Sequence, residues 1–313
     1  MTPHEVCYYI SRTVRIMETV LFAGYPKTGN TLVGQSLNYA GGIDQAPYGD
    51  IFIRRNQLTP TPNPLFETNT CCIKTHDSYH PFRNIDNLYF GKVSKIVVFN
   101  RNPFDLLLSA INYFRVVFER QGGKFDPTKE VALQYRRSLM LLIPDFEVKE
   151  TFLSDFSLET LRDNGMLDIA LRNFGENGTS ILNFYPLSGT WSEFTASYDG
   201  CGISLLKFSY EKLEQISINS TREDDVVSAE LQELSSFLEV DSERLNQGFA
   251  KQSRLVSEKK SESGGGAKFF NKSCSGYWKQ YFSKKECRYF LNHHHSAVVR
   301  NGYEYLIDEV KSM

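Results

Sequence analysis

The sequence lacks the features that mark membrane, secreted and disulfide-stabilised proteins. No apolar run approaches the ~18 residues that a membrane-spanning helix needs. The N-terminal residues do not join a basic stretch to an apolar one, as a secretory signal would. The six cysteines show no Cys-x-x-Cys spacing, so we expect free, buried thiols in a reducing compartment. These absences predict a cytoplasmic protein that makes no use of a membrane.

A strong charge bias is also missing. The formal net charge is -2, with 41% hydrophobic and 23% charged residues, which is ordinary for a globular protein. This balance argues against a broad nucleic-acid-binding face, although a local basic pocket stays possible. A metal site is not expected either, because the consecutive histidines 293–295 would point in different directions on a helix.

The apolar runs that are present alternate with segments of helical spacing. At 313 residues the chain is long enough for one large α/β domain or two modest ones, and we expect a single domain over 1–313. Alternation of this kind predicts an α/β fold with a mostly parallel central sheet flanked by helices. The expected strands cover 19–23, 71–76, 95–100, 181–184 and 203–208, and the expected helices cover 32–40, 105–118, 223–239, 241–250 and 284–299. Residues 43–70 read as a long irregular connection, and a flexible loop is expected at about 257–276 because of its serines and glycines.

The stretch 24–31 stands between the first expected strand and the first expected helix. A tight turn there directs backbone N–H groups and a helix N-terminus at whatever lies in the turn, and this favours an anion such as phosphate. The ammonium of Lys27 and the hydroxyls of Thr28 and Thr31 add further donors. The stretch is not a Walker A loop, because Lys27 precedes Gly29 instead of following it.

Polar groups also follow the next two expected strands. Lys74 and His76 end the second strand, and Arg101 follows the third, with Ser109 about two helical turns later. In a parallel sheet, ligands bind beyond the carboxyl ends of the strands. We therefore expect the cations, the histidine and the hydroxyls to converge at one edge.

These motifs resemble those of sulfotransferases that use 3′-phosphoadenosine-5′-phosphosulfate (PAPS). The stretch 24–31 looks like their 5′-phosphosulfate loop, and 101–105 with Ser109 resembles their 3′-phosphate-binding strand–loop–helix. Residues 73–76 are similar to the strand end that carries their catalytic histidine. Residues 210–213 and 272–279 resemble two later segments of the family, in the same order along the chain.

The resemblance implies a role for each matching residue. Lys27 would donate to the bridging oxygen of the leaving phosphate, Lys74 would contact the sulfuryl oxygens, and His76 would act as general base toward the acceptor. The other matching residues would bind the cofactor: Thr28, Gly29, Asn30, Thr31, Arg101, Ser109, Tyr210, Lys272 and Ser273. For Tyr210, contact with adenine and ordinary core packing stay open, and Arg101 could instead pair with Asp105. The chain departs from the family at Leu32, where many members have tryptophan, and at Asn271 and Ser273.

The expected function is transfer of a sulfuryl group from PAPS to a hydroxyl, or less favourably an amine, of a small-molecule acceptor. Two alternatives remain: a P-loop-type or kinase-like nucleotide-binding protein, and a non-catalytic nucleotide sensor. The absent Walker lysine argues against the first, and the retained Lys27, Lys74 and His76 argue against the second. The sequence leaves the acceptor and the oligomeric state open.

Overall fold

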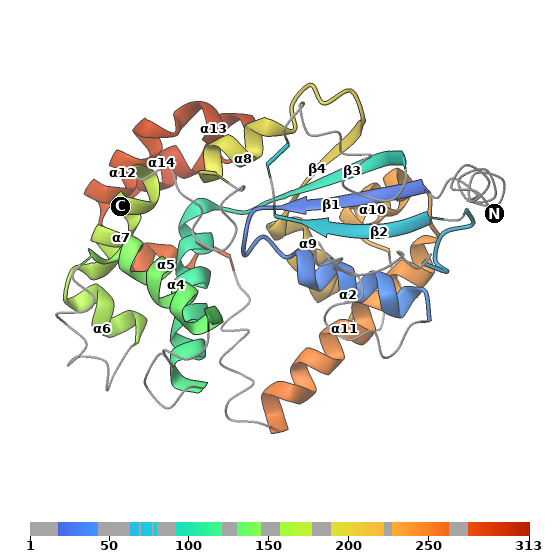
Figure 1. Ribbon diagram of the computed structural model, residues 1–313, viewed down its shortest axis with the longest axis horizontal. Helices are drawn as coiled ribbons and strands as arrows, with labels where there is room; N and C mark the ends of the chain where they lie inside the picture. The colour runs from blue at the N-terminus through green and yellow to red at the C-terminus, as the bar shows by residue number, and fades with distance from the viewer. Residues whose placement is uncertain are drawn as a thin grey trace, which may run out of the picture.

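Four parallel strands form the central sheet of the computed structural model, in the order β2-β1-β3-β4 (Figure 1). They are β1 (Glu18–Gly24), β2 (Thr70–Thr75), β3 (Lys92–Asn100) and β4 (Ser204–Ser209). The structure describes residues 18–42, 63–68, 70–76, 78–79, 92–120, 130–144, 157–176, 189–221, 227–262 and 275–313. The predicted α/β class and the parallel sheet are confirmed within these residues.

Alternate side chains of the strands enter two apolar clusters, one on each face of the sheet. On β1, Val20 and Phe22 belong to the smaller cluster, whereas Leu21 and Ala23 belong to the larger one. Because successive side chains of a strand point to opposite faces, a sheet covered on both sides needs apolar residues at every position. The continuous apolar runs of the sequence reflect this double burial.

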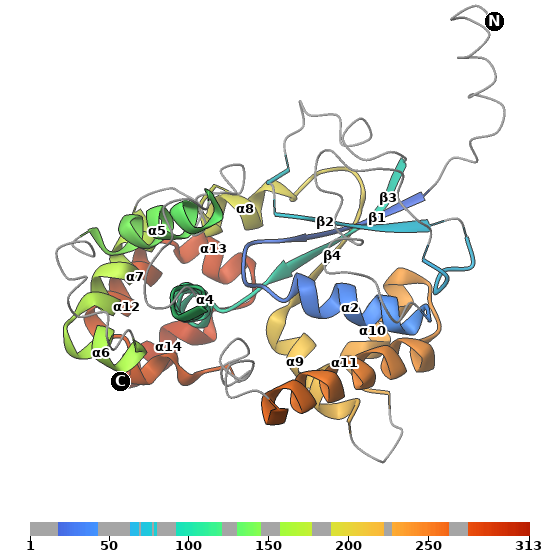
Figure 2. The ribbon, with the colours of Figure 1, turned by 60° about the horizontal axis from the view of Figure 1, so that its bottom comes forward.

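In the described part of the chain, four helices cover the face that carries the smaller cluster, as Figure 2 shows for the blue, yellow and orange segments. They are α2 (Asn30–Ala40), α9 (Tyr210–Asn219), α10 (Ala229–Leu238) and α11 (Ser242–Glu262). Asp241 opens α11 as expected, since its Oδ1 accepts a hydrogen bond of 2.7 Å from the backbone N–H of Arg244. The helix continues to Glu262, so residues 257–262, which we expected in a flexible loop, are helical.

The remaining described helices gather beyond the carboxyl ends of β1 and β3 and over the other face (Figure 1). They are α4 (Pro103–Arg120), α5 (Glu130–Leu142), α6 (Leu158–Asp163), α7 (Met166–Glu176), α8 (Trp191–Ser197), the 3-10 helix η4 (Tyr277–Gln280), α12 (Lys284–His293), α13 (His295–Arg300) and α14 (Tyr305–Ser312). In the part of the chain that the structure describes, no helix combines the length and the apolar character needed to cross a bilayer. The expected strand at 181–184 lies outside the described residues.

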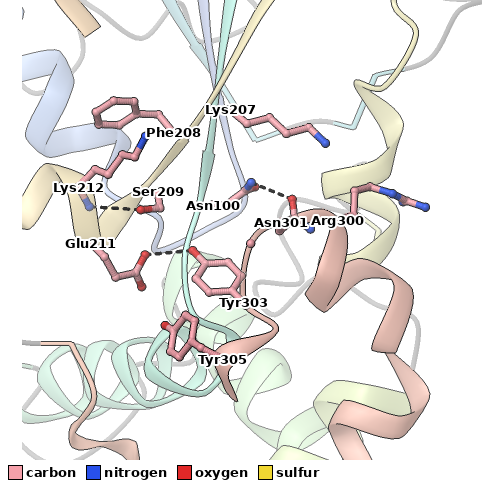
Figure 3. A pocket seen from close by; sticks show the side chains of 11 residues that line it. Asn100, Lys207, Phe208, Ser209, Glu211, Lys212, Arg300, Asn301, Tyr303 and Tyr305 are labelled. Atoms are coloured by element: carbon pink, nitrogen blue, oxygen red, sulfur yellow. Dashed lines mark hydrogen bonds between the residues drawn. The ribbon is translucent and has the colours of Figure 1, made fainter. Parts of the chain in front are cut away.

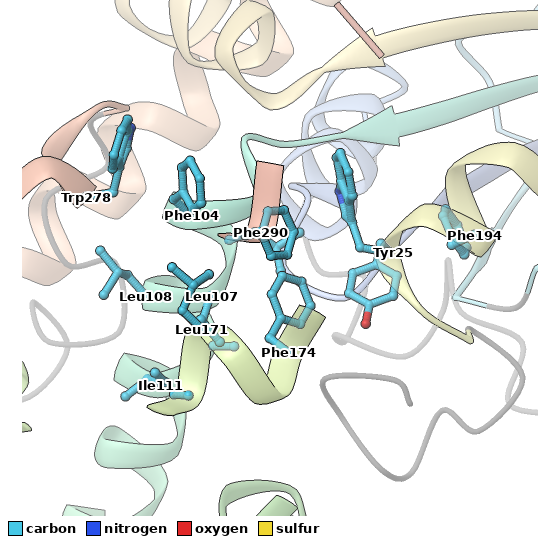
Figure 4. Packing of buried hydrophobic residues seen from close by; sticks show 14 of the residues in the cluster. Tyr25, Phe104, Leu107, Leu108, Ile111, Leu171, Phe174, Phe194, Trp278 and Phe290 are labelled. Carbon is cyan, nitrogen blue, oxygen red and sulfur yellow. The ribbon is translucent and has the colours of Figure 1, made fainter. Parts of the chain in front are cut away.

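An aromatic core joins these helices to the anion loop. The fully buried ring of Tyr25 lies 5.7 Å from that of Phe194 and 6.4 Å from that of Phe174, centre to centre. Figure 4 shows these rings together with Phe104, Phe290 and others of the larger cluster. The residue next to the loop's Pro26 is thus anchored in the core, and this fixes the position of the loop.

Candidate functional site

The loop between β1 and α2 has a backbone conformation that few residues adopt. Lys27 has φ 77° and Gly29 has φ 97°, in the left-handed region, which costs a non-glycine residue about 1–2 kcal/mol. Gly29 is the N-cap of α2. The first N–H groups of a helix have no acceptor within the helix, so this end of α2 favours an anion.

The side chains of Thr28 and Asn30 brace the loop from within. The Thr28 hydroxyl donates to Tyr25 O at 2.7 Å, and Asn30 Nδ2 donates to Thr75 O at 3.3 Å, across to β2. A Cβ on Gly24 would lie 1.9 Å from Asn30 Oδ1, so any larger residue there would displace the Asn30 side chain. The backbone N–H of Thr28 also donates to Tyr25 O, at 3.2 Å. The expected phosphate contact of this pair would therefore involve the backbone N–H of Asn30.

Lys27 lies at the centre of the site. Its Nζ is 4.2 Å from the centre of the Tyr113 ring, and its carbonyl accepts a hydrogen bond of 3.1 Å from Arg101 Nη1. Burial, followed by the charges of Arg101 and Lys74, lowers the pKa of Lys27 to about 7. An adjacent anion would raise this pKa again, since it favours the charged amine.

The end of β2 places Lys74 and His76 beside the same loop. Lys74 Nζ lies 3.5 Å from Thr31 Oγ1, and burial lowers the pKa of Lys74 to about 8. His76 Nδ1 lies 2.5 Å from the carbonyl oxygen of Gly24. A carbonyl only accepts, so Nδ1 carries the proton and Nε2 keeps its lone pair. Burial and the charge of Lys74 hold the pKa of His76 well below its usual value, which keeps the ring neutral near pH 7.

Arg101 begins the turn between β3 and α4 and is only 6% exposed. Its guanidinium carbon lies 4.0 Å from the centre of the Tyr210 ring, and its buried Nε has no hydrogen-bond acceptor among the described residues. Native proteins rarely leave such a donor unpaired. The alternative ion pair between Arg101 and Asp105 does not appear among the described contacts. Arg101 instead lies over the Tyr210 ring and donates to the carbonyl of Lys27. The Tyr210 ring also packs against the loop, since a Cβ on Gly29 would lie 2.9 Å from it.

Carboxylates that the sequence reasoning left without a role lie close to Arg101. Asp105 Oδ2 accepts a hydrogen bond of 2.7 Å from Gly276 N, and Glu214 Oε2 accepts one of 3.2 Å from Ser275 N. Burial raises the pKa of Asp105 to about 6. The two carboxylates thus anchor the backbone at 275–276 near the guanidinium. Among the expected cofactor residues, Lys272 and Ser273 lie outside the described residues.

Ser109 lies on the same face of α4 as Asp105 and Tyr113, because residues four apart are neighbours on a helix. Its side chain is half-buried. Tyr113 is the contact residue that the sequence reasoning missed. Its spacing from Ser109 is the signal that could have indicated it, since that spacing predicts a shared helix face.

Apart from this site, a pocket of about 330 Å³ lies between the ends of β3 and β4, the start of α9 and residues 300–305 (Figure 3). Glu211 connects the two places: its Oε1 accepts from Asn102 N and its Oε2 accepts from the Tyr303 hydroxyl, both at 3.0 Å. Asn301 Oδ1 accepts from Asn100 Nδ2 at 2.8 Å, and the buried Asn100 Oδ1 has no donor in the ranges that the structure describes. The remaining lining residues are Lys207, Phe208, Ser209, Lys212, Arg300, Gly302 and Tyr305.

The histidines at 293–295 separate at the junction of α12 and α13. His294 contacts Ser192 Oγ and the carbonyl of Gly175, whereas the ring of His293 packs on that of Tyr289. Within the described ranges, no group of His, Cys, Asp and Glu is arranged to hold a metal ion.

The first site therefore joins three cations to a neutral imidazole at the carboxyl edge of the sheet. Lys27, Lys74 and Arg101 would neutralise an anion, and the Nε2 lone pair of His76 can accept a proton. Such a set suits transfer of an anionic group between oxygen atoms. Neither a protein-family model nor a curated protein matches the chain.

Proposed function

We propose that the protein is a PAPS-dependent sulfotransferase with a P-loop-like sulfotransferase fold, acting on a hydroxyl of a small-molecule acceptor. The observation that carries the proposal is the meeting of Lys27, Lys74 and Arg101 around a helix N-terminus, next to His76 with its Nδ1 on Gly24 O. The motifs that resemble the family supplied these same residues. A cytoplasmic location belongs to the proposal as well.

The donor set fits an adenosine nucleotide with two phosphate sites. The buried Nε of Arg101, which has no acceptor within the described part of the chain, suits a phosphate oxygen, and Ser109 lies farther along α4 for the 3′-phosphate. Lys27 and the N-terminus of α2 would hold the 5′ end. PAPS, when bound, supplies the activated sulfuryl group.

The residues of the chain then have separate tasks. Lys27 neutralises the charge that develops on the departing phosphate oxygen, and Lys74 stabilises the charge of the group in transit. His76 accepts the acceptor's proton at Nε2 and is suited to this because it is neutral near pH 7. The buried setting strengthens each of these interactions.

The test is incubation with ³⁵S-labelled PAPS and a panel of phenols, alcohols and amines. We expect label on a hydroxyl acceptor and release of adenosine 3′,5′-bisphosphate. His76→Ala should lower kcat by about 10²–10⁴-fold, while His293→Ala, remote from the site, should not. Full turnover by His76→Ala would contradict the mechanism, and phosphoryl transfer from ATP and Mg²⁺ would favour the kinase-like alternative.

A further inference from the structure

One ring in the site has no role in the proposed chemistry so far. Tyr113 lies on α4 at a spacing of four from Ser109, and the centre of its ring is 4.2 Å from Lys27 Nζ. The side chain is half-buried and packs against the larger apolar cluster. The ring is therefore held by the core and presents a face to the ammonium.

We propose that Tyr113 is a positioning residue: its ring face holds the Lys27 ammonium beside the anion loop, aimed at the oxygen that departs. The contribution of Tyr113 to catalysis rests on the proposed function. The attraction between the Tyr113 ring and Lys27 does not depend on it. The charged and titratable groups that act on Lys27 come from two other strand ends, Lys74 and His76 after β2 and Arg101 after β3. Both cations repel the ammonium, and the ring face on α4 is an attractive surface that opposes this repulsion.

A ring face suits this task better than a carboxylate would. The negative face of an aromatic ring attracts a cation within about 6 Å without cancelling its net charge. A carboxylate would form an ion pair and weaken the positive potential that the leaving oxygen requires. Arg101 also lies over a ring, 4.0 Å from the centre of that of Tyr210, but the carboxylates of Asp105 and Glu214 lie near it as well.

The direct test measures the pKa of Lys27 by NMR titration of lysine labelled with ¹³C and ¹⁵N, the signal being assigned with Lys27→Arg. Tyr113→Leu keeps an apolar side chain but removes the ring face, and we expect the pKa of Lys27 to fall by about 0.5–1 unit. Tyr113→Phe keeps the face and should change the pKa by less than about 0.3 units. Tyr289→Leu removes a ring 5.3 Å from Arg172, remote from the site, and should leave Lys27 unchanged.

The kinetic test separates positioning from binding. Tyr113→Leu should lower kcat about tenfold with the KM for PAPS within about twofold, and Tyr113→Phe should restore most of kcat. Circular dichroism checks that each variant is folded, and Tyr113→Met replaces Tyr113→Leu if the latter is not. Equal lysine pKa values in the Leu (or Met) and Phe variants would overturn the proposal. Absence of sulfuryl transfer by the unaltered protein would overturn the proposed function alone, since the titration does not depend on it.

Discussion

At the scale of single residues, the charge on Lys27 depends on what is bound beside it. Its pKa of about 7 follows first from burial and then from neighbouring cations. Lys74 follows the same rule, with burial lowering its pKa to about 8. In the free protein these lysines are thus only partly protonated at pH 7.5–8. A bound anion would cause them to take up protons.

We predict that adenosine 3′,5′-bisphosphate binds with net uptake of protons. Its phosphates raise the lysine pKa values, so at pH 8 the complex holds protons that the free protein lacks. Affinity should fall as the pH rises from about 7 to 9, by up to tenfold per pH unit for each lysine. Calorimetry at pH 8 in buffers of different ionisation enthalpy measures the uptake.

Lys27→Arg provides the control, because a guanidinium stays charged throughout this range. The variant should take up fewer protons than the unaltered protein at pH 8, whatever its affinity. Identical uptake by the two proteins would show that Lys27 is not the group that gains the proton.

At the scale of elements, the contact between α2 and α11 depends on one glycine. A Cβ on Gly248 would lie 2.2 Å from the carbonyl oxygen of Ser36 and 2.9 Å from Ala40. The backbones of the two helices therefore approach more closely than any side chain at this position allows. The N-terminal end of α2, which forms part of the site, is held by this same helix pair.

Gly248→Ala should destabilise the protein by about 1–3 kcal/mol. Within most helices the same replacement is stabilising, by roughly 0.5–1 kcal/mol, so the sign of the effect reports the close approach. Urea unfolding measures it. Gln247→Ala changes an exposed neighbour on α11 and should alter the free energy of unfolding by less than about 0.5 kcal/mol. If Gly248→Ala stabilised the protein, the close approach of α2 and α11 would be contradicted.

The elements that the sequence predicted best are those with a strong local pattern. The run 95–100 is β-branched and continuous, and it lies in β3 as expected. The extension of α11 to Glu262 was missed because the serines of 257–262 suggested a loop, whereas lysine and glutamate there form helices well. Helix α7 was also missed, although its buried Met166, Leu167, Ala170, Leu171 and Phe174 follow a helical stripe.

The sequence predicted only those residues of the site that lie at the ends of strands. Lys27, Lys74, His76 and Arg101 each follow a strand, and parallel strands bring such residues to one edge. The contacts of Tyr113 and Glu214 could not be derived in this way, because they depend on how α4 and α9 pack against the loop and against residues 275–276. The position of the Tyr210 ring against the Arg101 guanidinium has the same origin.

At the scale of the whole molecule, the cations of the site oppose folding. A lysine whose pKa is 10.5 when unfolded and about 7 when folded destabilises the folded state fully below pH 7. The cost shrinks as the pH rises from 7 and disappears above about 10.5. The protein is therefore less stable than its core alone would make it.

Lys27→Met should raise the free energy of unfolding by about 2–4 kcal/mol at pH 6 and by clearly less at pH 9. The variant should also lose sulfuryl transfer, so stability and function would change in opposite directions. Urea unfolding at the two pH values gives the comparison. Lys311→Met, which changes an exposed side chain, is the matched control. If the stability gained by Lys27→Met were the same at both pH values, this explanation would be refuted.

The burial of Tyr25 has a consequence for protein engineering. Its ring lies among Phe174, Phe194 and the other rings of the larger cluster (Figure 4). The stretch 24–31 therefore cannot be moved to another protein on its own with its conformation intact. If this peptide were inserted into another protein that lacks aromatic residues around Tyr25, the loop would lose the packing contacts that fix its conformation. A successful transplant would have to include α7 and α8 as well.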